Sequence, residues 1–570
     1  MEEKKLTGYP SIDKPWLKYY SEEAINAPLP ECTMYEFVWQ NNKDYLSDVA
    51  LRYYGTKISY GKLFQYIKRA AAAFFAMGVR AGDIVTIMSM HTPETIISIY
   101  ALNYLGAVAN LVYMTLSPKE VMETLHNTES KMLLILDVAL DKVIEIGDEI
   151  GVPVVVQSAA TSMSLGIKLG YKFKTKLPKH NFTTWKSFLS KGDHLILREP
   201  EHDHERAAVI VYTSGTTGEP KGVVLSNDAM NAFSFQDQNI LDFKRQWRFL
   251  MAIPPFIGFG VTMIHLILNL GLCSTLWLDT NAQSIADEYF KLKPELFIGG
   301  PVFIDSFLKH SPVDLKHIKL FAGGGGALLE AKEKAINTLL KQSNADVLYA
   351  SAYGMTETST LCYPVYNHHK EKSVGVPLPR TNIKVVDVER RQELTYGETG
   401  ELLFSSPNLM TAYYRMPKET REVITIDENE TRWLHTGDLG MIDTDGFVYI
   451  TGRIKRIYPI KGKDNTIYRL FPQRLEEFFI EQNNVERCGV IVKEDAEMLN
   501  KIVVFVSLSD YSQDKKSTLQ RLISSCRQNL PEHLQPAEVH ILDFMPMTQS
   551  GKIDYRLLEE RAAREYQQET

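Results

Sequence analysis

The chain has 570 residues, of which 44% are hydrophobic and 23% charged, and its formal net charge is −7. This length predicts about three to five folding units, and the composition is typical of a folded soluble protein. A nucleic-acid binder usually carries a basic excess, which this chain lacks. Five scattered cysteines indicate buried thiols in a reducing compartment, with no zinc or disulfide framework among them. The charged N-terminus has no apolar signal-peptide segment, so we expect a cytoplasmic protein.

The first part of the chain alternates short apolar runs with helical patterns. Residues 92–106 form one such helical pattern, because Pro93 is tolerated in a first turn and Gly106 closes it. Alternation of this kind predicts parallel sheets whose strands are joined by helical crossovers. The expected strands are 83–90, 108–114, 131–137, 154–157 and 208–212, and a further helix is expected over 60–78.

Residues 249–278 contain no Asp, Glu, Lys or Arg, and their length alone would permit a membrane span of ~20 residues. The segment is interrupted, however, by Pro254, Pro255, Gly258, Gly260 and Gly271. A buried helix followed by a strand is therefore the better interpretation.

Residues 158–185 alternate apolar residues with Ser, Gly and Lys, and five lysines fall within 168–179. The pattern predicts an exposed hairpin or loop. The alternative is a basic, apolar surface that contacts a membrane or an acidic partner.

From about residue 380 the patterns become β-rich, as in "TNIKVVDV", "GELLFSS" and "GFVYITGR". The end of the chain then has the pattern of a compact unit with helices at "PQRLEEFFIEQ" and "KSTLQRLISSCRQNL" and strands around them. We therefore expect a domain boundary near Lys455, between residues 1–454 and 455–570.

The segment "YTSGTTGEPKG" at 212–222 places hydroxyl residues, glycines and a lysine directly after a strand pattern. Glycines let backbone N–H groups approach a ligand, Ser and Thr add donors, and Lys221 supplies a point charge for a phosphate. The pattern predicts a triphosphate-binding loop, with a mobile surface loop as the alternative. It is not the Walker motif, which would require a glycine at Pro220 and Ser or Thr at Gly222.

The segment resembles the signature loop of the adenylate-forming superfamily, which contains acyl-CoA synthetases, peptide-synthetase adenylation domains and luciferases. Five more motifs follow in the order of that family: "SAYGMTETS" (351–359), "GELLFSSPNLMTAYYRMPKET" (400–420), "WLHTGDLG" (433–440), "DGFVYITGRIKR" (445–456) and "PMTQSGKIDYRLL" (546–558). The resemblance covers the chain from about residue 33. It implies an α/β fold: a large N-terminal domain of parallel-type sheets with helices and a distorted β-barrel subdomain, followed by a small, mobile α+β C-terminal domain.

The resemblance also implies roles in ATP binding. Asp438 would accept hydrogen bonds from both ribose hydroxyls, since a carboxylate accepts through two oxygens, and Arg453 would lie beside it. Lys552 would bridge the substrate carboxylate and the α-phosphate. Glu357 would bind Mg²⁺, a hard cation that prefers oxygen ligands. The phosphate contacts would come from Thr213, Ser214, Gly215, Thr216, Thr217, Lys221 and Thr356, and the adenine contacts from Tyr353, Gly354, Gly324 and Gly325.

Each of these residues also has a simpler interpretation. Taken alone, Glu357 would be a surface residue, Tyr353 a core residue, and the "SGK" ending at Lys552 a solvated turn. The motifs around them favour function, with Lys552, Thr356, Glu357 and Lys221 as the catalytic set.

The acid pocket departs from the amino-acid-activating members of the family. Their aspartate, which pairs with a substrate ammonium, is replaced by Ile257 within "PPFIGFG". A substrate α-ammonium would be buried without a partner there, which is expensive, so we expect an acid without one. The pocket would draw on Phe256, Ile257, Gly258, Phe259, Gly300, Pro301, Gly324 and Gly325, a lining that suits either a fatty or an aromatic acid.

The resemblance places a hinge at Lys455 and a thiol tunnel at Gly462. The segment after Gly462 is several residues longer than the family norm, and Arg474 stands where an acidic residue is usual. Both departures lie in the segment that would guide the entry of the thiol, so the details of thiol entry do not follow from the resemblance.

The implied activity is that of an ATP- and Mg²⁺-dependent acyl-CoA synthetase, which forms an acyl-adenylate and then a CoA thioester. A second interpretation keeps the same adenylation but delivers the acyl group to the phosphopantetheine of a free carrier protein. A third, of another class, is an inactive nucleotide-binding scaffold, against which the intact Lys221, Glu357, Asp438, Arg453 and Lys552 argue.

Overall fold

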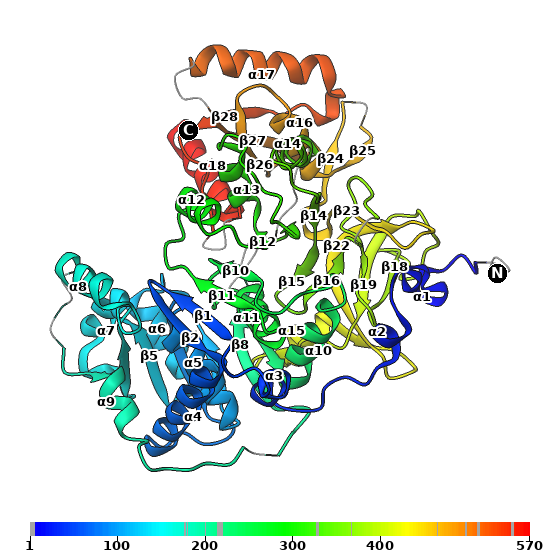
Figure 1. Ribbon diagram of the computed structural model, residues 1–570. Helices are drawn as coiled ribbons and strands as arrows, with labels where there is room; N and C mark the ends of the chain where they lie inside the picture. Colours follow the sequence, from blue (N-terminus) through cyan, green and yellow to red (C-terminus); the bar gives the residue numbers. More distant parts are fainter. Residues whose placement is uncertain are drawn as a thin grey trace.

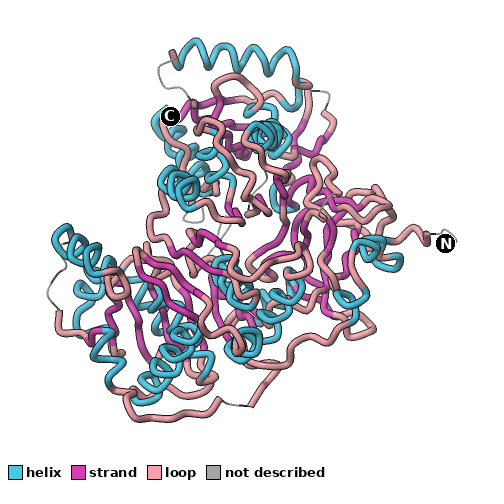
Figure 2. The backbone as a smooth tube through the Cα atoms, viewed as in Figure 1, coloured by secondary structure: helices cyan, strands magenta, loops and turns pink. Residues whose placement is uncertain are grey.

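The computed structural model describes residues 6–175, 178, 180–199, 201–213, 220–325, 330–365, 368–463, 465–495, 499–509, 514–548 and 552–569. Figure 1 shows a large N-terminal part and a smaller C-terminal part stacked above it. Figure 2 shows that strands run through the centre of each part, with helices outside them. The fold is α/β, as the sequence predicts.

The first sheet of the large part has eight strands in the order β20-β9-β8-β4-β3-β5-β6-β7. Its central strands pair in parallel, as the alternation of strand and helix patterns predicts. Helix α5 (Pro93–Tyr104) begins with Pro93 after the Thr92 cap, as expected. The strands are β3 (Ile84–Met88), β4 (Val108–Leu111), β5 (Met132–Leu136), β6 (Val154–Gln157), β7 (Thr183–Thr184), β8 (Ala207–Tyr212), β9 (Gly222–Ser226) and β20 (Ala412–Tyr413).

The second sheet has seven strands in the order β14-β13-β12-β10-β11-β1-β2. All of its pairings are parallel except that between β1 and β2. The strands are β1 (Val49–Tyr53), β2 (Thr56–Ser59), β10 (Arg248–Met251), β11 (Cys273–Leu276), β12 (Leu296–Gly299), β13 (Leu320–Gly323) and β14 (Tyr349–Ser351).

Helix α11 (Gly258–Asn269) lies within the hydrophobic core that the two sheets share. Every residue of α11 except Phe259 is buried. The helix is followed by β11, so the charge-free segment is the buried helix and strand that its prolines and glycines predict. Among the described residues, no helix is both long enough and apolar enough to cross a membrane.

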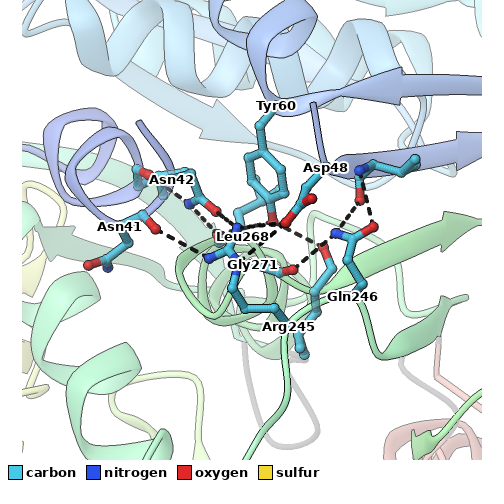
Figure 3. A network of polar contacts seen from close by, with 11 residues as sticks. Asn41, Asn42, Asp48, Tyr60, Arg245, Gln246, Leu268 and Gly271 are labelled. Atoms are coloured by element: carbon cyan, nitrogen blue, oxygen red, sulfur yellow. Dashed lines mark hydrogen bonds and ion pairs between the residues drawn. The ribbon is translucent and has the colours of Figure 1, made fainter. Parts of the chain in front are cut away.

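A polar network closes the C-terminal end of α11 (Figure 3). Arg245 donates to Asn42 Oδ1 at 3.0 Å and to Asp48 Oδ2 at 3.2 Å, and the Tyr60 hydroxyl donates to the Leu268 carbonyl at 3.2 Å. Gly271 has a φ of 67°, and a Cβ there would lie 2.2 Å from the Arg245 guanidinium. A glycine is therefore required where Arg245 packs across the end of the helix.

Two antiparallel sheets form the β-rich region between residues 353 and 453, on the right of Figure 1. They share one hydrophobic core around the fully buried Trp16. The strands are β15 (Tyr353–Met355), β16 (Ser359–Tyr363) and β17 (Val376–Pro377) in one sheet, and β18 (Asn382–Val386), β19 (Gly400–Ser405), β21 (Ile424–Ile426), β22 (Arg432–Ile442) and β23 (Val448–Arg453) in the other.

The small C-terminal part is α+β. Its sheet has the order β26-β27-β28, and a separate hairpin pairs β24 with β25. The elements are β24 (Tyr458–Lys461), β25 (Ile467–Leu470), α16 (Pro472–Ile480), β26 (Val485–Asp495), β27 (Leu499–Leu508), α17 (Lys515–Asn529), β28 (Glu538–Leu542) and α18 (Tyr555–Glu569). The segment after Gly462 contributes β25, which pairs with β24, and then the start of α16.

Residues 158–185 differ from the expected hairpin or loop. They contain helix α8 (Leu165–Lys174), none of whose residues is buried. Leu165, Leu169 and Phe173 are spaced four apart, which suits one face of a helix as well as the alternation in the sequence. All five cysteines are buried and free, as predicted.

Candidate active site

One cavity of about 2570 Å³ is lined by both parts of the chain. It collects residues from the β8–β9 hairpin, α11, β13, β15, β22, β23 and the segment before α18. Sixteen of the predicted site residues line it: Thr213, Lys221, Phe256, Ile257, Phe259, Gly300, Gly324, Gly325, Tyr353, Gly354, Thr356, Glu357, Asp438, Arg453, Lys455 and Lys552.

Strands β8 and β9 form an antiparallel hairpin with the candidate phosphate loop at its tip. The base of that loop is closed by two hydrogen bonds of 3.0 Å, from the Thr213 amide to the Lys221 carbonyl and from the Lys221 amide to Thr213 Oγ1. These bonds hold Thr213 and Lys221 side by side at the wall of the cavity, which both residues line. The expected phosphate contacts Ser214, Gly215, Thr216 and Thr217 lie outside the described residues.

Glu357 is buried at the cavity wall, and its carboxylate is held by Tyr413. The Tyr413 hydroxyl donates to Glu357 Oε1 at 2.6 Å, and burial together with the nearby carboxylate raises the pKa of Tyr413. The Lys221 ammonium lies 4.7 Å from the centre of the same ring. Strand β20 pairs with β9, which brings Tyr413 to Lys221. Within the described part of the chain, Oε2 of Glu357 accepts no hydrogen bond. This carboxylate oxygen therefore suits a role as a Mg²⁺ ligand.

Tyr353, Asp438 and Arg453 form a hydrogen-bonded group on the opposite wall. The Tyr353 hydroxyl donates to Asp438 Oδ2 at 2.7 Å, and Arg453 Nε lies 2.7 Å from Asp438 Oδ1. Asp438 and Arg453 are paired across β22 and β23, which fixes their separation. The Asp438 carboxylate is buried whereas Arg453 is half-exposed. The charge of Asp438 raises the pKa of Arg453, so the guanidinium stays charged beside the cavity.

Lys552 reaches the same cavity from the C-terminal part. Two hydrogen bonds join Lys552 to Thr548: the Thr548 amide donates to the Lys552 carbonyl at 2.7 Å, and the Lys552 amide donates to Thr548 Oγ1 at 3.2 Å. Burial, reinforced by the positive charge of Arg453, lowers the pKa of Lys552, whereas Asp438 and Glu357 act in the opposite direction. All three groups are therefore close enough to Lys552 to influence its charge.

The N-terminus of α11 packs directly against Thr356 at the wall of the cavity. A Cβ at Gly258 would lie 3.1 Å from Thr356 Cγ2, so the glycine allows the close approach. From there the cavity follows one face of the helix, through Phe259, Met263, Leu266, Ile267 and Leu270. This spacing of three and four residues is that of a single helical stripe, and it gives the cavity a long apolar wall.

One polar group interrupts the apolar part of the cavity. Asp237, at the end of α10 (Asn227–Asp237), lines the cavity and is buried. Its Oδ2 atom makes no hydrogen bond within the described part of the chain. Burial raises the pKa of Asp237 well above its usual value, which favours the neutral acid.

Two described residues of the predicted site, Gly258 and Gly462, do not line the cavity. Gly258 contributes through its packing against Thr356. Pro301 is the first residue of α13 (Pro301–Leu308), and its side chain lies outside the described part of the chain. Gly462, expected in a thiol tunnel, lies in the turn after β24, where its amide donates to the Thr466 carbonyl at 2.9 Å. Lys455 does line the cavity, from a short 3-10 helix, Ile454–Arg456, between the two parts.

Sequence reasoning missed Tyr413 and the α11 residues beyond Phe259. Tyr413 lies within the quoted segment 400–420, but only its G-E-L element carried the argument. Its pairing with Glu357 spans 56 positions and depends on β20 joining the first sheet. The α11 stripe was open to detection, because Phe259, Met263 and Leu266 have helical spacing within the apolar segment.

The chain is similar in sequence to known CoA ligases and in fold to a solved structure. A long-chain-fatty-acid–CoA ligase of Bacillus subtilis is 26% identical over 570 residues, covering 96% of this chain and 98% of the relative. A 4-coumarate–CoA ligase of Arabidopsis thaliana is 25% identical over 518 residues, covering 88% of this chain and 85% of the relative. The crystal structure of ATP-bound MatB from Rhodopseudomonas palustris has the same fold, with a TM-score of 0.78 and 22% identity over 93% of this chain and 99% of the other.

Two family models match the chain in sequence order. The model for the C-terminal domain of AMP-binding enzymes matches residues 474–552, which end at Lys552. The model for the AMP-binding enzyme itself matches residues 37–414, more than half of the chain, and includes the candidate phosphate loop and Glu357. The chain therefore belongs to the AMP-binding enzyme family.

Proposed function

We propose that the protein is an AMP-forming acid–CoA ligase that activates a long-chain fatty acid. The observation that carries the proposal is the shape of the cavity. Lys221, Glu357 and Lys552 line it together, and an apolar wall along α11 begins beside Thr356. Nucleotide chemistry and a long apolar substrate thus have adjoining places in one cavity.

In the first half-reaction, a carboxylate oxygen attacks the α-phosphorus of ATP and pyrophosphate leaves, giving an acyl-adenylate. We assign Thr213, Lys221 and Thr356 to the β- and γ-phosphates, and Lys552 to the carboxylate and the α-phosphate. Preorganised donors of this kind act where charge builds up on phosphate oxygens. Mg²⁺ held by Glu357 would neutralise charge on the phosphates. Asp438, oriented by Tyr353 and Arg453, would accept from the ribose hydroxyls.

The length of the apolar wall favours a fatty acid over a compact aromatic acid. From Gly258 to Leu270 is twelve residues, a rise of about 18 Å at 1.5 Å per residue. An extended acyl chain advances ~1.25 Å per carbon, since each C–C bond is about 1.52 Å long. The wall therefore accommodates about fourteen carbons. The long-chain-fatty-acid–CoA ligase among the relatives supports this choice, whereas the 4-coumarate–CoA ligase keeps the aromatic alternative in the test.

In the second half-reaction, the thiol of CoA attacks the acyl carbon, the thioester forms and AMP leaves. We propose that residues 455–570 act as a mobile domain that turns about Lys455 between the two halves. The position of Lys455 between the two parts of the chain, on the wall of their shared cavity, supports this assignment.

The test is AMP release from ATP and Mg²⁺ over a panel of fatty acids of increasing length and aryl acids, each with and without CoA. We expect catalytic AMP release only with CoA, with long saturated acids as the best substrates. Acid-dependent pyrophosphate exchange without turnover on CoA would instead indicate a carrier-protein acceptor. Aryl acids outperforming long-chain acids would refute the assignment of the acid. Neither exchange nor turnover with any acid would favour the scaffold.

A further inference from the structure

Three potential metal ligands lie at the base of the hairpin that carries the candidate phosphate loop. His202 and His204 precede β8, and Asp228 follows β9 in the first turn of α10. Ala207 pairs with Ser226 at this end of the hairpin, so the two flanking segments are held side by side. A turn over 203–206, closed by the Arg206 amide donating to the Asp203 carbonyl at 3.2 Å, includes His204 and leads into β8.

The donor atoms of these residues converge. One ligand atom from each of His202, His204 and Asp228 can be chosen so that all three lie within 4.8 Å of one another. His202 Nε2 lies 2.9 Å from Asp228 Oδ1, and His204 Nδ1 lies 2.5 Å from Asp228 Oδ2. The two imidazole rings meet edge to face, with centres 4.8 Å apart.

Of the two contacts between the histidines and Asp228, only one is a hydrogen bond. His204 Nδ1 and Asp228 Oδ2 form a hydrogen bond. By contrast, both ring nitrogens of His202 and the Oδ1 atom of Asp228 are buried and make no hydrogen bond within the described residues, although Nε2 and Oδ1 are close. Buried polar atoms that approach one another without hydrogen-bond geometry call for a shared partner.

We propose that His202, His204 and Asp228 bind a divalent transition-metal ion of the Zn²⁺ type, which ties the segment before β8 to the start of α10. Two imidazole nitrogens and one carboxylate oxygen form a donor set that Zn²⁺ accepts, with water completing a tetrahedron. Tetrahedral ligands at about 2.0–2.1 Å from zinc are about 3.3 Å apart, and the three donor atoms, one from each residue, already lie within 4.8 Å of one another. A hard cation such as Mg²⁺ prefers oxygen ligands and does not suit this set.

The proposed metal site lies far from the candidate active site, which indicates a structural role. Strand β8 has six residues, which at about 3.3 Å each separates the metal from the phosphate loop by roughly 20 Å. The ion would therefore hold the base of the hairpin and take no part in the reaction at its tip. Because it binds the folded chain and not the unfolded chain, it would raise the free energy of unfolding.

The test uses the full-length protein without a histidine tag, stripped with a chelator and then titrated with Zn²⁺ against a colorimetric competitor. We expect about one zinc per chain, a thermal midpoint raised by about 2 °C or more, and an absorption spectrum of tetrahedral type when Co²⁺ replaces zinc. His202→Ala and Asp228→Asn should each weaken zinc binding by about tenfold or more. His310→Ala is the matched control, because His310 pairs with Asp287 at 3.3 Å at a distant surface; it should bind zinc as the parent does.

Two results would overturn the proposal. One is the absence of saturable zinc binding in the parent protein. The other is equal binding by the parent, His202→Ala and Asp228→Asn, which would place the ion elsewhere. His204→Gln provides a further variant at an exposed side chain, so a folding defect at the more buried His202 would not leave the question open. The metal-free thermal midpoint of each variant reports its folding directly.

Discussion

Replacing Met263 by tryptophan should turn the protein into a short-chain enzyme. Met263 is buried, lines the cavity, and lies five residues beyond Gly258 on α11. Five residues correspond to a rise of about 7.5 Å, or roughly six acyl carbons at ~1.25 Å each. The tryptophan ring is larger than the methionine side chain and would block the cavity at this position. The space for the acyl chain would then end after roughly six carbons, and the roughly fourteen carbons proposed for the wall up to Leu270 would no longer fit.

The magnitude follows from the methylene groups that lose their place. Each buried methylene contributes about 0.8 kcal/mol, or about fourfold in kcat/KM. In the parent protein, kcat/KM should therefore rise about fourfold per carbon until the wall ends. Eight methylene groups separate hexanoate from tetradecanoate, an upper limit of about 6 kcal/mol. Because a chain can bend into other space, we expect Met263→Trp to lower kcat/KM for tetradecanoate by ~10²-fold or more while sparing hexanoate.

The assay is CoA-dependent AMP release over even-numbered saturated acids, with the thermal midpoint measured in parallel. Overpacking a core costs about 1–3 kcal/mol, so a folded variant is expected at moderate temperature. Leu270→Trp is the matched control, because it adds the same ring at the far end of the stripe and should affect only the longest acids. An equal loss for hexanoate and tetradecanoate in Met263→Trp would show that the acyl chain does not follow α11.

Three further substitutions test other parts of the site. Lys552→Ala should lower acid-dependent pyrophosphate exchange by about 10²–10³-fold while thioester formation from supplied acyl-adenylate is retained; equal loss of both would contradict its role. Tyr413→Phe removes the 2.6 Å hydrogen bond to Glu357 and should raise the Mg²⁺ concentration for half-maximal rate by about tenfold, whereas an unchanged Mg²⁺ dependence would separate Glu357 from the metal. Asp237→Asn should remove a pH-dependent loss of stability. Burial raises the pKa of Asp237 in the folded chain, so between its ordinary and raised pKa the folded state keeps a proton that the unfolded state releases. The free energy of unfolding then falls as pH rises, by at most about 1.4 kcal/mol per unit. Urea unfolding should therefore show a larger advantage of Asp237→Asn over the parent at pH 8 than at pH 5; an equal advantage at both would refute this account.

Local sequence patterns were enough to predict those elements whose structure depends on residues close in sequence. The helix starting at Pro93 has its Thr92 cap and proline within one turn, and the charge-free segment around α11 is interrupted by its own prolines and glycines. The residues named from motifs also converge on one cavity. Lys221, Asp438 and Lys552 are examples from three different segments.

Local patterns failed where long-range pairing or the absence of burial decides the structure. Helix α8 buries no residue, so no stripe facing a core distinguishes it from an alternating strand, and Leu165 and Phe173 remain exposed. Tyr413 reaches Glu357 only because a two-residue strand joins the first sheet from almost 200 positions away. The closure of the far end of α11 by Arg245 likewise depends on Asn42 and Asp48, which lie 203 and 197 positions earlier in the sequence.

The placement of Lys552 bears on how one cavity serves two half-reactions. Its ammonium lies near Asp438 and Glu357, where the carboxylate and the α-phosphate would meet. This arrangement suits adenylate formation. The turn with Gly462, from the same C-terminal part, does not line the cavity. A thiol guided by that turn would reach the acyl carbon only after the C-terminal part had moved. We therefore propose that withdrawal of Lys552 and approach of the β24–β25 hairpin are one motion about Lys455. If so, fixing the present arrangement with a cross-link between the two parts should preserve pyrophosphate exchange and abolish thioester formation, and reduction of the cross-link should restore it.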